Sequence, residues 1–194
     1  MRRITHLACI LAVTFVSSVA FAAKYDIDPA HSEVGFKIRH LVSKTRGRFD
    51  KFSGTVQFDP TNLAKLSTDV TIDTKSINTN SEKRDTHLRS ADFFNVEKFP
   101  IMTFKSTSAK KIGDNKLQLM GNLTLLGVTK PVALEVEYTG EANDPWGNVR
   151  SGFTAVGKIN RKDFGMTYNI TDKGGVVIGD DVDLLIEVET IKQK

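Results

Sequence analysis

The first alternating stretch of the chain reads Ser32-Glu33-Val34-Gly35-Phe36-Lys37-Ile38-Arg39-His40. Val34, Phe36 and Ile38 share one parity, whereas the other parity carries mostly charged residues. Because successive side chains of a β-strand point to opposite faces, this alternation is typical of a strand with one buried and one solvated face. The stretch therefore predicts a half-buried strand, and His40 continues its inward parity to the strand end.

Seven further segments repeat the pattern, at 52–58, 68–72, 102–108, 117–125, 132–138, 153–159 and 182–188. Strands that are apolar on one face only are typical of an antiparallel, all-β protein. Two architectures fit this reading: a closed eight-stranded barrel and a two-sheet sandwich. The inward positions include small residues, which favour a barrel with space inside, although strand glycines also mark bulges. These small residues are Gly54, Gly121, Ala155 and Gly157.

The stretch 79–95 interrupts the alternation. Thr79 and Glu82 have the spacing of a capping box, and Asn80 or Ser81 is an equally plausible N-cap. We therefore expect a short polar helix in a crossover between the third and fourth predicted strands, lying on or over one barrel end. A plain surface connection is the alternative.

The N-terminus has the three-part layout of a secretory signal peptide. Two arginines precede a mostly apolar run to Val19, and Ala20-Phe21-Ala22 provides the small residues of a cleavage site. We expect residues 1–22 to be the signal, cleaved after Ala22 or Ala23, and residues 23–194 to form a single domain. The apolar run is shorter than the ~20 residues of a spanning helix, and a retained anchor is the alternative.

Export changes the charge and the cysteine count of the working protein. The whole sequence has 27 Lys+Arg against 23 Asp+Glu, a net charge of +4, and one cysteine, Cys9. Loss of residues 1–22 removes two arginines and Cys9, so the net charge falls to +2 and no disulfide can form. A charge of +2 over roughly 172 residues is low for a nucleic-acid-binding protein, so we expect no nucleic-acid partner.

Few residues are candidates for catalysis or metal binding. Three histidines remain after cleavage, His31, His40 and His87, and the first two lie nine positions apart, a spacing without a standard metal-ligand signature. His31 and His40 also differ in parity, so a regular strand would point them to opposite faces. The sequence contains no GxSxG motif and no phosphate-binding glycine pattern. We therefore expect no metal, no cofactor and no enzyme activity.

Six basic residues lie between Lys37 and Lys51, with Asp50 as the only acid among them. They flank the first predicted hairpin, so several could ring one barrel opening and attract an anionic head group. The alternative is a solvated hairpin whose charges discourage edge-to-edge pairing. A smaller basic set, Arg84, His87 and Arg89, lies on the crossover among acids that could pair with it.

Several of these stretches closely resemble the YceI-like family. The matches follow in order across essentially the whole chain after the signal: Asp28–Leu41, Arg84–Phe94, Phe99–Pro100, Thr103–Ser106, Gly121–Leu125, Gly127–Val132, Asp144–Gly147 and Lys162–Met166. The chain looks like the exported branch of that family in Gram-negative bacteria, which implies a location in the periplasm.

The resemblance implies a lipocalin-like antiparallel barrel with an elongated apolar interior. Members of the family bind long-chain amphiphiles, notably polyisoprenoids with a pyrophosphate or quinone head, and some bind fatty-acid amides. The resemblance favours the barrel over the sandwich. The expected fold is thus all-β, an eight-stranded barrel with a short helical crossover between strands 3 and 4.

Our first hypothesis is a carrier or store for a long-chain isoprenoid-type lipid. The head group is expected to meet His40, Arg39 and Arg46 beside the basic hairpin. The residues expected to line the cavity are Phe36, Ile38, Phe52, Phe58, Phe104, Leu123, Leu134, Phe153 and Leu184.

Two other hypotheses stand beside it. In the second, the protein presents a quinone to a membrane cytochrome in electron transfer or a stress response. In the third, it is an enzyme, such as a metal-dependent hydrolase. We expect no stable membrane insertion, and the sequence leaves open the exact lipid, a homodimer, and ligand contacts of His31, His40 and His87.

Overall fold

The structure is a computed structural model that describes residues 22–169, 171–172 and 175–194. The predicted signal peptide, apart from Ala22, lies outside the described residues.

One α-helix, α1 (Glu82–Arg89), occurs in the described part of the chain. Short 3-10 turns are η1 (Pro29–His31), η2 (Leu63–Lys65), η3 (Thr74–Ser76) and η4 (Arg161–Phe164). The strands are β1 (Ala23–Ile27), β2 (Glu33–His40), β3 (Ser43–Phe49), β4 (Phe52–Phe58), β5 (Ser67–Asp73), β6 (Ile77–Asn78), β7 (Ile101–Lys111), β8 (Lys116–Leu125), β9 (Val128–Asn143), β10 (Val149–Asn160), β11 (Thr171–Asp172), β12 (Gly175–Val176) and β13 (Ile178–Lys192).

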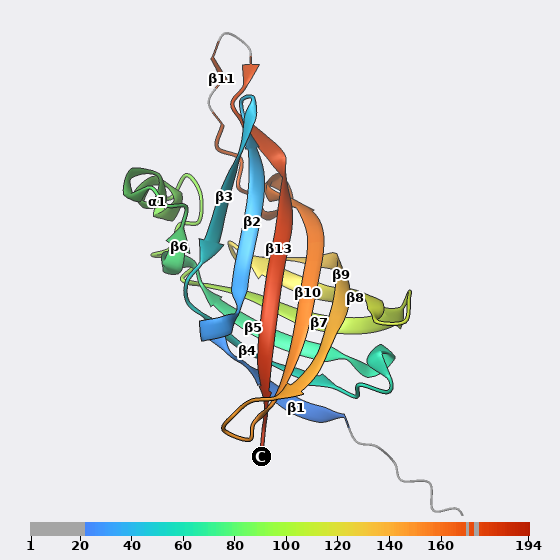
Figure 1. The fold of residues 1–194 in the computed structure, drawn as a ribbon. Helices are drawn as coiled ribbons and strands as arrows, with labels where there is room; N and C mark the ends of the chain where they lie inside the picture. Colours follow the sequence, from blue (N-terminus) through green and yellow to red (C-terminus); the bar gives the residue numbers. More distant parts are fainter. Residues whose placement is uncertain (1–21, 170, 173–174) are drawn as a thin grey trace, which may run out of the picture.

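Eight strands close into an antiparallel barrel, as predicted (Figure 1). Their order is β1, β4, β5, β7, β8, β9, β10 and β13, and β13 pairs back with β1. The edge of β13 that pairs with β1 also pairs, at other residues, with β2. Strand β2 then pairs with β3, and β3 with β6. Residues 178–187 of β13 pair with β2, and residues 190–192 pair with β1.

Strands β1 and β2 therefore follow one another along β13, with the turn η1 between them. Pro29 starts this turn, and the carboxylate of Asp28 caps it by accepting a hydrogen bond from the Ala30 amide at 3.0 Å. Below the turn β1 pairs with β4, and above it β2 pairs with β3. This interruption gives the barrel two different ends.

The predicted crossover helix is α1, between β6 and β7, and the predicted strands before and after it are β5 and β7. Its N-cap is Ser81, which makes no side-chain capping bond, and Thr79 instead donates to the buried carboxylate of Asp85. In Figure 1, α1 lies beside β6, to one side of the barrel. Within the described residues, no helix has the length and apolarity that crossing a bilayer requires.

An aromatic cluster fills the barrel at the end where β1 closes it. The ring centroid of Phe58 lies 4.7 Å from that of Tyr25, 5.6 Å from that of Tyr138 and 5.1 Å from that of Phe153. Burial and a 2.9 Å hydrogen bond to Glu141 raise the pKa of Tyr25 to about 12. The Tyr25 hydroxyl is therefore a donor at neutral pH, and the cluster forms a packed floor.

Truncating the centre of this floor should destabilise the protein. Phe58 is fully buried, so Phe58→Ala should lower the free energy of unfolding by about 3–5 kcal/mol through lost transfer energy and a new cavity. Urea unfolding followed by far-UV circular dichroism measures the change. The control Val156→Ala, at a side chain that is 49% exposed, should change it by less than about 0.5 kcal/mol. Equal losses in the two variants would contradict the packed floor.

Candidate functional site

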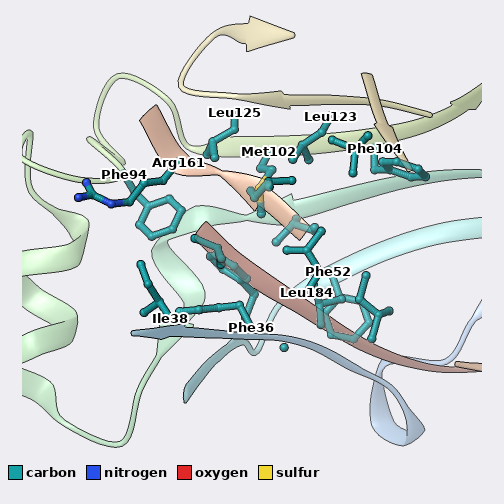
Figure 2. Close-up of a pocket in the computed structure, with 18 of the residues that line it drawn as sticks. Phe36, Ile38, Phe52, Phe94, Met102, Phe104, Leu123, Leu125, Arg161 and Leu184 are labelled. Carbon is teal, nitrogen blue, oxygen red and sulfur yellow. The ribbon is translucent and has the colours of Figure 1, made fainter. Parts of the chain in front are cut away.

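An elongated cavity of about 680 Å³ occupies the barrel above the aromatic floor (Figure 2). Its volume lies within the ~300–1,000 Å³ typical of small-molecule sites. Along β13 the lining residues include Val182, Leu184, Ile186 and Val188, each second residue of this stretch. At about 3.3 Å per residue, these four span about 20 Å. The cavity is therefore long and narrow, with the shape of an extended chain.

Most of the predicted lining residues do face this cavity. They are Phe36, Ile38, Phe52, Phe104, Leu123, Leu134, Phe153 and Leu184. Phe58 is not among the lining residues, which corrects its predicted place: it packs into the aromatic floor below. Contact of these side chains with a ligand stays a prediction.

The two walls of the cavity differ in packing. Met102 and Leu123 on the far wall are buried, whereas Phe36 on β2 and Leu184 and Ile186 on β13 are only partly buried. Side chains that point inward without full packing keep apolar surface that a ligand can cover. The β2–β13 wall thus keeps apolar surface that a bound ligand would cover.

Basic side chains surround one end of the cavity. Arg39 and His40 at the end of β2, and Lys83, Arg84 and His87 on α1, all line it and all are exposed. Because exposed residues line this end, the cavity meets solvent here. We call these five residues the entrance.

The entrance only partly matches the head-group residues predicted from sequence. Arg39 and His40 belong to it, but Arg46 is not among the lining residues. Arg46 pairs with Lys37 across the hairpin, opposite the face that carries Phe36 and Ile38, so it lies on the outer surface. Sequence reasoning noted the charges on α1 but could not place them at the cavity.

Part of the α1 contribution is fixed by a local network. The Arg84 side chain donates to the Thr79 hydroxyl at 2.7 Å and to the Thr79 carbonyl at 2.6 Å. His87 lies 2.9 Å from the Asp92 carboxylate, the pairing that the interspersed acids suggested. The start of α1 is therefore tied to the strand end before it, which holds Arg84 and His87 at the entrance.

Arg161 is a buried cation that the sequence reasoning missed. Its guanidinium is 2% exposed and donates to the carbonyls of Met166 at 2.7 Å and Tyr168 at 2.8 Å. Burial lowers its pKa, although arginine stays charged in proteins. A signal was present, since Arg161 continues the inward parity of Phe153, Ala155, Gly157 and Ile159.

The loop that Arg161 holds also meets α1. The ring of Tyr168 lies 5.1 Å from that of His87 and 5.0 Å from that of Phe93. These aromatic contacts join the end of the barrel to the crossover. Arg161 therefore positions one side of the entrance without reaching solvent.

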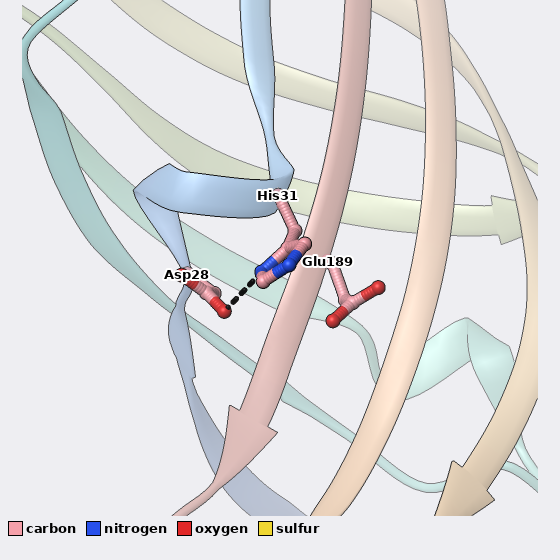
Figure 3. Close-up of side chains that lie close together, drawn as sticks. All are labelled: Asp28, His31 and Glu189. Carbon is pink, nitrogen blue, oxygen red and sulfur yellow. Dashed lines mark hydrogen bonds and ion pairs between the residues drawn. The ribbon is translucent and has the colours of Figure 1, made fainter. Parts of the chain in front are cut away.

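At the other end of the barrel, Asp28, His31 and Glu189 bring their polar atoms within 4.8 Å of one another (Figure 3). His31 lies in η1 and not in a strand, so the parity argument for it does not apply, and Nδ1 of its ring is 2.8 Å from Asp28. Arg150 donates to Asp28 at 2.7 Å, to Asp144 at 2.9 Å and to Glu189. A guanidinium thus already neutralises these carboxylates, and a metal ion would have to displace it.

This network lowers the pKa of two of its carboxyl groups. The Arg150 hydrogen bond holds the pKa of Asp28 below its ordinary value. Hydrogen bonds from Asn148 and Arg150 hold the pKa of Asp144 well below its ordinary value. Groups with lowered pKa values stabilise the fold above their unfolded pKa, and this contribution is lost as the pH falls through the folded pKa.

Replacing Arg150 should therefore lower the stability of the fold, and the loss should depend on pH. Arg150→Met leaves Asp28, Asp144 and Glu189 facing one another, so the thermal midpoint at pH 7 should fall. Below about pH 4 protons bind to the carboxyl groups of the unfolded chain and to those of the variant, which lacks the cation, so the difference from the unchanged protein should shrink. Circular dichroism melts at pH 7 and pH 3 measure both effects, with exposed Lys130→Met as control. An equal loss at both pH values would contradict the network.

Comparison with known proteins adds to this geometry. A model of the YceI-like domain family matches residues 25–190. Protein YceI of Salmonella arizonae is 49% identical over 186 residues, covering 94% of each chain. The crystal structure of the Campylobacter jejuni YCEI protein is 40% identical, with a TM-score of 0.70, and the match covers 86% of this chain and 96% of that one.

A more distant structure shares the fold. It is described as a polyisoprenoid binding domain from Saccharophagus degradans implicated in plant cell wall breakdown. The TM-score is 0.64 at 16% identity, and the match covers 89% of this chain and 99% of that one. At this identity the likeness concerns the fold alone.

Proposed function

We propose that this chain, which belongs to the YceI-like family, binds a long-chain isoprenoid-type amphiphile in its barrel and acts as a carrier or store. The long apolar cavity with a basic entrance carries this proposal. The cavity suits an apolar tail, and the entrance suits an anionic or polar head. The polyisoprenoid-binding description of the Saccharophagus degradans domain supports the same class of ligand.

The energetics are adequate for such a tail. Burying ten CH₂ equivalents at ~0.8 kcal/mol each gives roughly 8 kcal/mol before ordering costs. That free energy corresponds to a dissociation constant of about 1 μM. A longer tail would bind more tightly, while the head group would mainly set orientation.

We also propose that residues 1–22 are a signal peptide, that the remaining residues form one domain, and that the protein works in the periplasm. The basic start, apolar run and Ala20-Phe21-Ala22 support export. The intact mass of protein recovered from the periplasm tests this, because it should begin at Ala23 or Lys24. A mass that includes Met1 would contradict cleavage.

Filling the cavity should weaken lipid binding, whereas the same substitution on the outer face of the barrel should not. Ala155 lines the cavity, and the next residue on β10, Val156, points outward. Ala155→Trp should weaken binding of a polyprenyl lipid on the order of tenfold or more, because the indole takes the volume of the tail. Native mass spectrometry of detergent-free protein measures this loading, with Val156→Trp as the matched control.

The same spectra separate the hypotheses. Protein that carries no lipid, and takes up none when offered polyprenyl ligands, would contradict the proposal. Equal loading of both tryptophan variants would place binding outside the cavity. A co-purified quinone would favour the second hypothesis, presentation of a quinone to a membrane cytochrome.

The entrance should recognise the head group and not the tail. Lys83→Gln should weaken binding of a prenyl pyrophosphate by about fivefold, the effect of losing one exposed charge contact. Binding of the matching prenol should stay unchanged. Arg46→Gln, on the outer face, is the control and should affect neither ligand. Titration of the soluble protein with both ligands measures these constants, and equal losses for prenol and pyrophosphate would contradict a head-group role.

A further inference from the structure

The hairpin formed by β2 and β3 carries an exposed apolar turn at its tip. Leu41 is 54% exposed and Val42 is fully exposed. The turn is held in place, because the Leu41 amide donates to the Val177 carbonyl at 2.8 Å. Leu41 also has a φ of 50°, a left-handed conformation that leucine rarely adopts. Two large apolar side chains are thus presented to solvent by an anchored turn.

The outer face of the same hairpin is basic. Strand register places Lys37 opposite Arg46 and Arg39 opposite Lys44, so like charges face each other in pairs. Such pairs destabilise a sheet unless an anion compensates them. Asp183 lies 3.9 Å from Lys37 and 3.2 Å from Lys44. Arg39 and Arg46, in contrast, form no ion pair among the described residues, so their charge is available to a partner.

The tip stands next to the cavity entrance. Ile38 and His40, on the inner face of this hairpin, line the cavity, and Lys83 and Arg84 line it from α1. In Figure 1 the hairpin rises at the end of the barrel away from β1 and the C-terminus. A surface that touched Leu41 and Val42 would therefore lie close to the opening.

The opposite end has a different character. Trp146, in the turn between β9 and β10, is 80% exposed, but this end carries the carboxylates of Glu141, Asp144 and Glu189. Arg150 pairs with Asp144 and Glu189, and Lys24 and Lys192 are exposed at this end. The entrance end differs because it places Arg39 and Arg46, which form no ion pair among the described residues, beside an exposed apolar turn. An anionic surface would select the entrance end.

We propose that the β2–β3 hairpin docks the barrel on an anionic lipid surface, with Leu41 and Val42 among the head groups and Arg39 and Arg46 against lipid phosphates. Interfacial binding of this kind combines apolar burial with attraction to anionic lipid. A specific protein partner would need a larger surface, about 1,000 Å² or more in total, than a two-residue tip provides. The inference concerns the tip and outer face of the hairpin, of which Arg39 alone also lines the entrance, and it holds whichever lipid the cavity binds.

A single tryptophan can report on each end of the molecule. The chain has one tryptophan, Trp146, so Trp146→Phe with Val42→Trp moves the fluorophore to the tip. With vesicles of phosphatidylglycerol and phosphatidylcholine, emission of the tip variant should shift to the blue, and vesicles of phosphatidylcholine alone should cause no shift. The unchanged protein, which reports from Trp146, should show no shift with either vesicle. A shift of Trp146 without one at the tip would overturn the proposed orientation.

Vesicle co-sedimentation tests the residues. Arg39→Gln with Arg46→Gln, and separately Val42→Ser, should lower the partition coefficient on the order of tenfold. Lys24→Gln with Lys192→Gln removes the same charge at the β1 end and is the matched control, expected to change it little. Raising the salt from about 0.1 M to about 0.5 M should weaken binding of the unchanged protein.

The results separate this inference from the proposed function. The vesicles contain no polyprenyl lipid, and cavity loading is measured independently by native mass spectrometry. Absence of vesicle binding, equal binding to both vesicle types, or equal loss in the control would overturn the docking surface even if the cavity loads normally. An empty cavity in a protein that binds anionic vesicles would overturn only the proposed ligand.

Discussion

The barrel depends on one strand, β13, which pairs with three neighbours at once. It meets β10 along one edge, and β2 and then β1 along the other. This pairing matters because the interior is a cavity of about 680 Å³ and not a filled core. Side chains that line a cavity make fewer contacts across it than side chains in a filled core. The closed ladder of backbone hydrogen bonds must therefore provide more of the stability of the barrel. A disulfide offers no help, since the single cysteine lies in the predicted signal.

The two ends of the barrel follow from how β13 divides its second edge. Where β1 pairs with this edge of β13, it also pairs with β4, and the ring closes. The aromatic side chains around Phe58 fill the floor there. Where β2 occupies it, β3 pairs outward, and the basic side chains of α1 line the opening. The break falls at η1, whose cap Asp28 is bound by Arg150 from β10. A single interruption between β1 and β2 thus separates a closed, aromatic floor from an open, basic entrance.

Alternation predicted the longer strands that carry apolar side chains on one face, and it missed the short strand β1 and the strand β3, whose inward positions are mostly small or polar. β3 is the main case: its inward Gly47 lies under the ring of Phe36, and an added Cβ would come within 2.4 Å of that ring. The lining was predictable because parity identifies the inward face. Parity does not give height along the barrel, which is why Phe58 was assigned to the cavity and belongs to the floor. A helical crossover on or over one barrel end was predicted, but tertiary packing decides which of its side chains line the cavity, so the lining by Lys83, Arg84 and His87 was not predicted.

An incompletely packed wall couples ligand binding to barrel closure. Phe36 and Leu184, paired across β2 and β13, leave apolar surface that a bound tail would remove from water. A ligand that binds only the folded barrel stabilises it by about 2.7 kcal/mol at a hundredfold excess over its dissociation constant. The surface that a ligand would cover lies where β13 pairs with β2, and β13 closes the ring farther along, where it pairs with β1. We therefore expect the β2–β13 pairing to be the least stable part of the barrel without ligand, and the part whose stability a ligand raises most. Arg39 and His40 of the entrance lie at the end of β2, one strand of this pair, so release of the tail and loosening of the β2–β13 pairing would occur together.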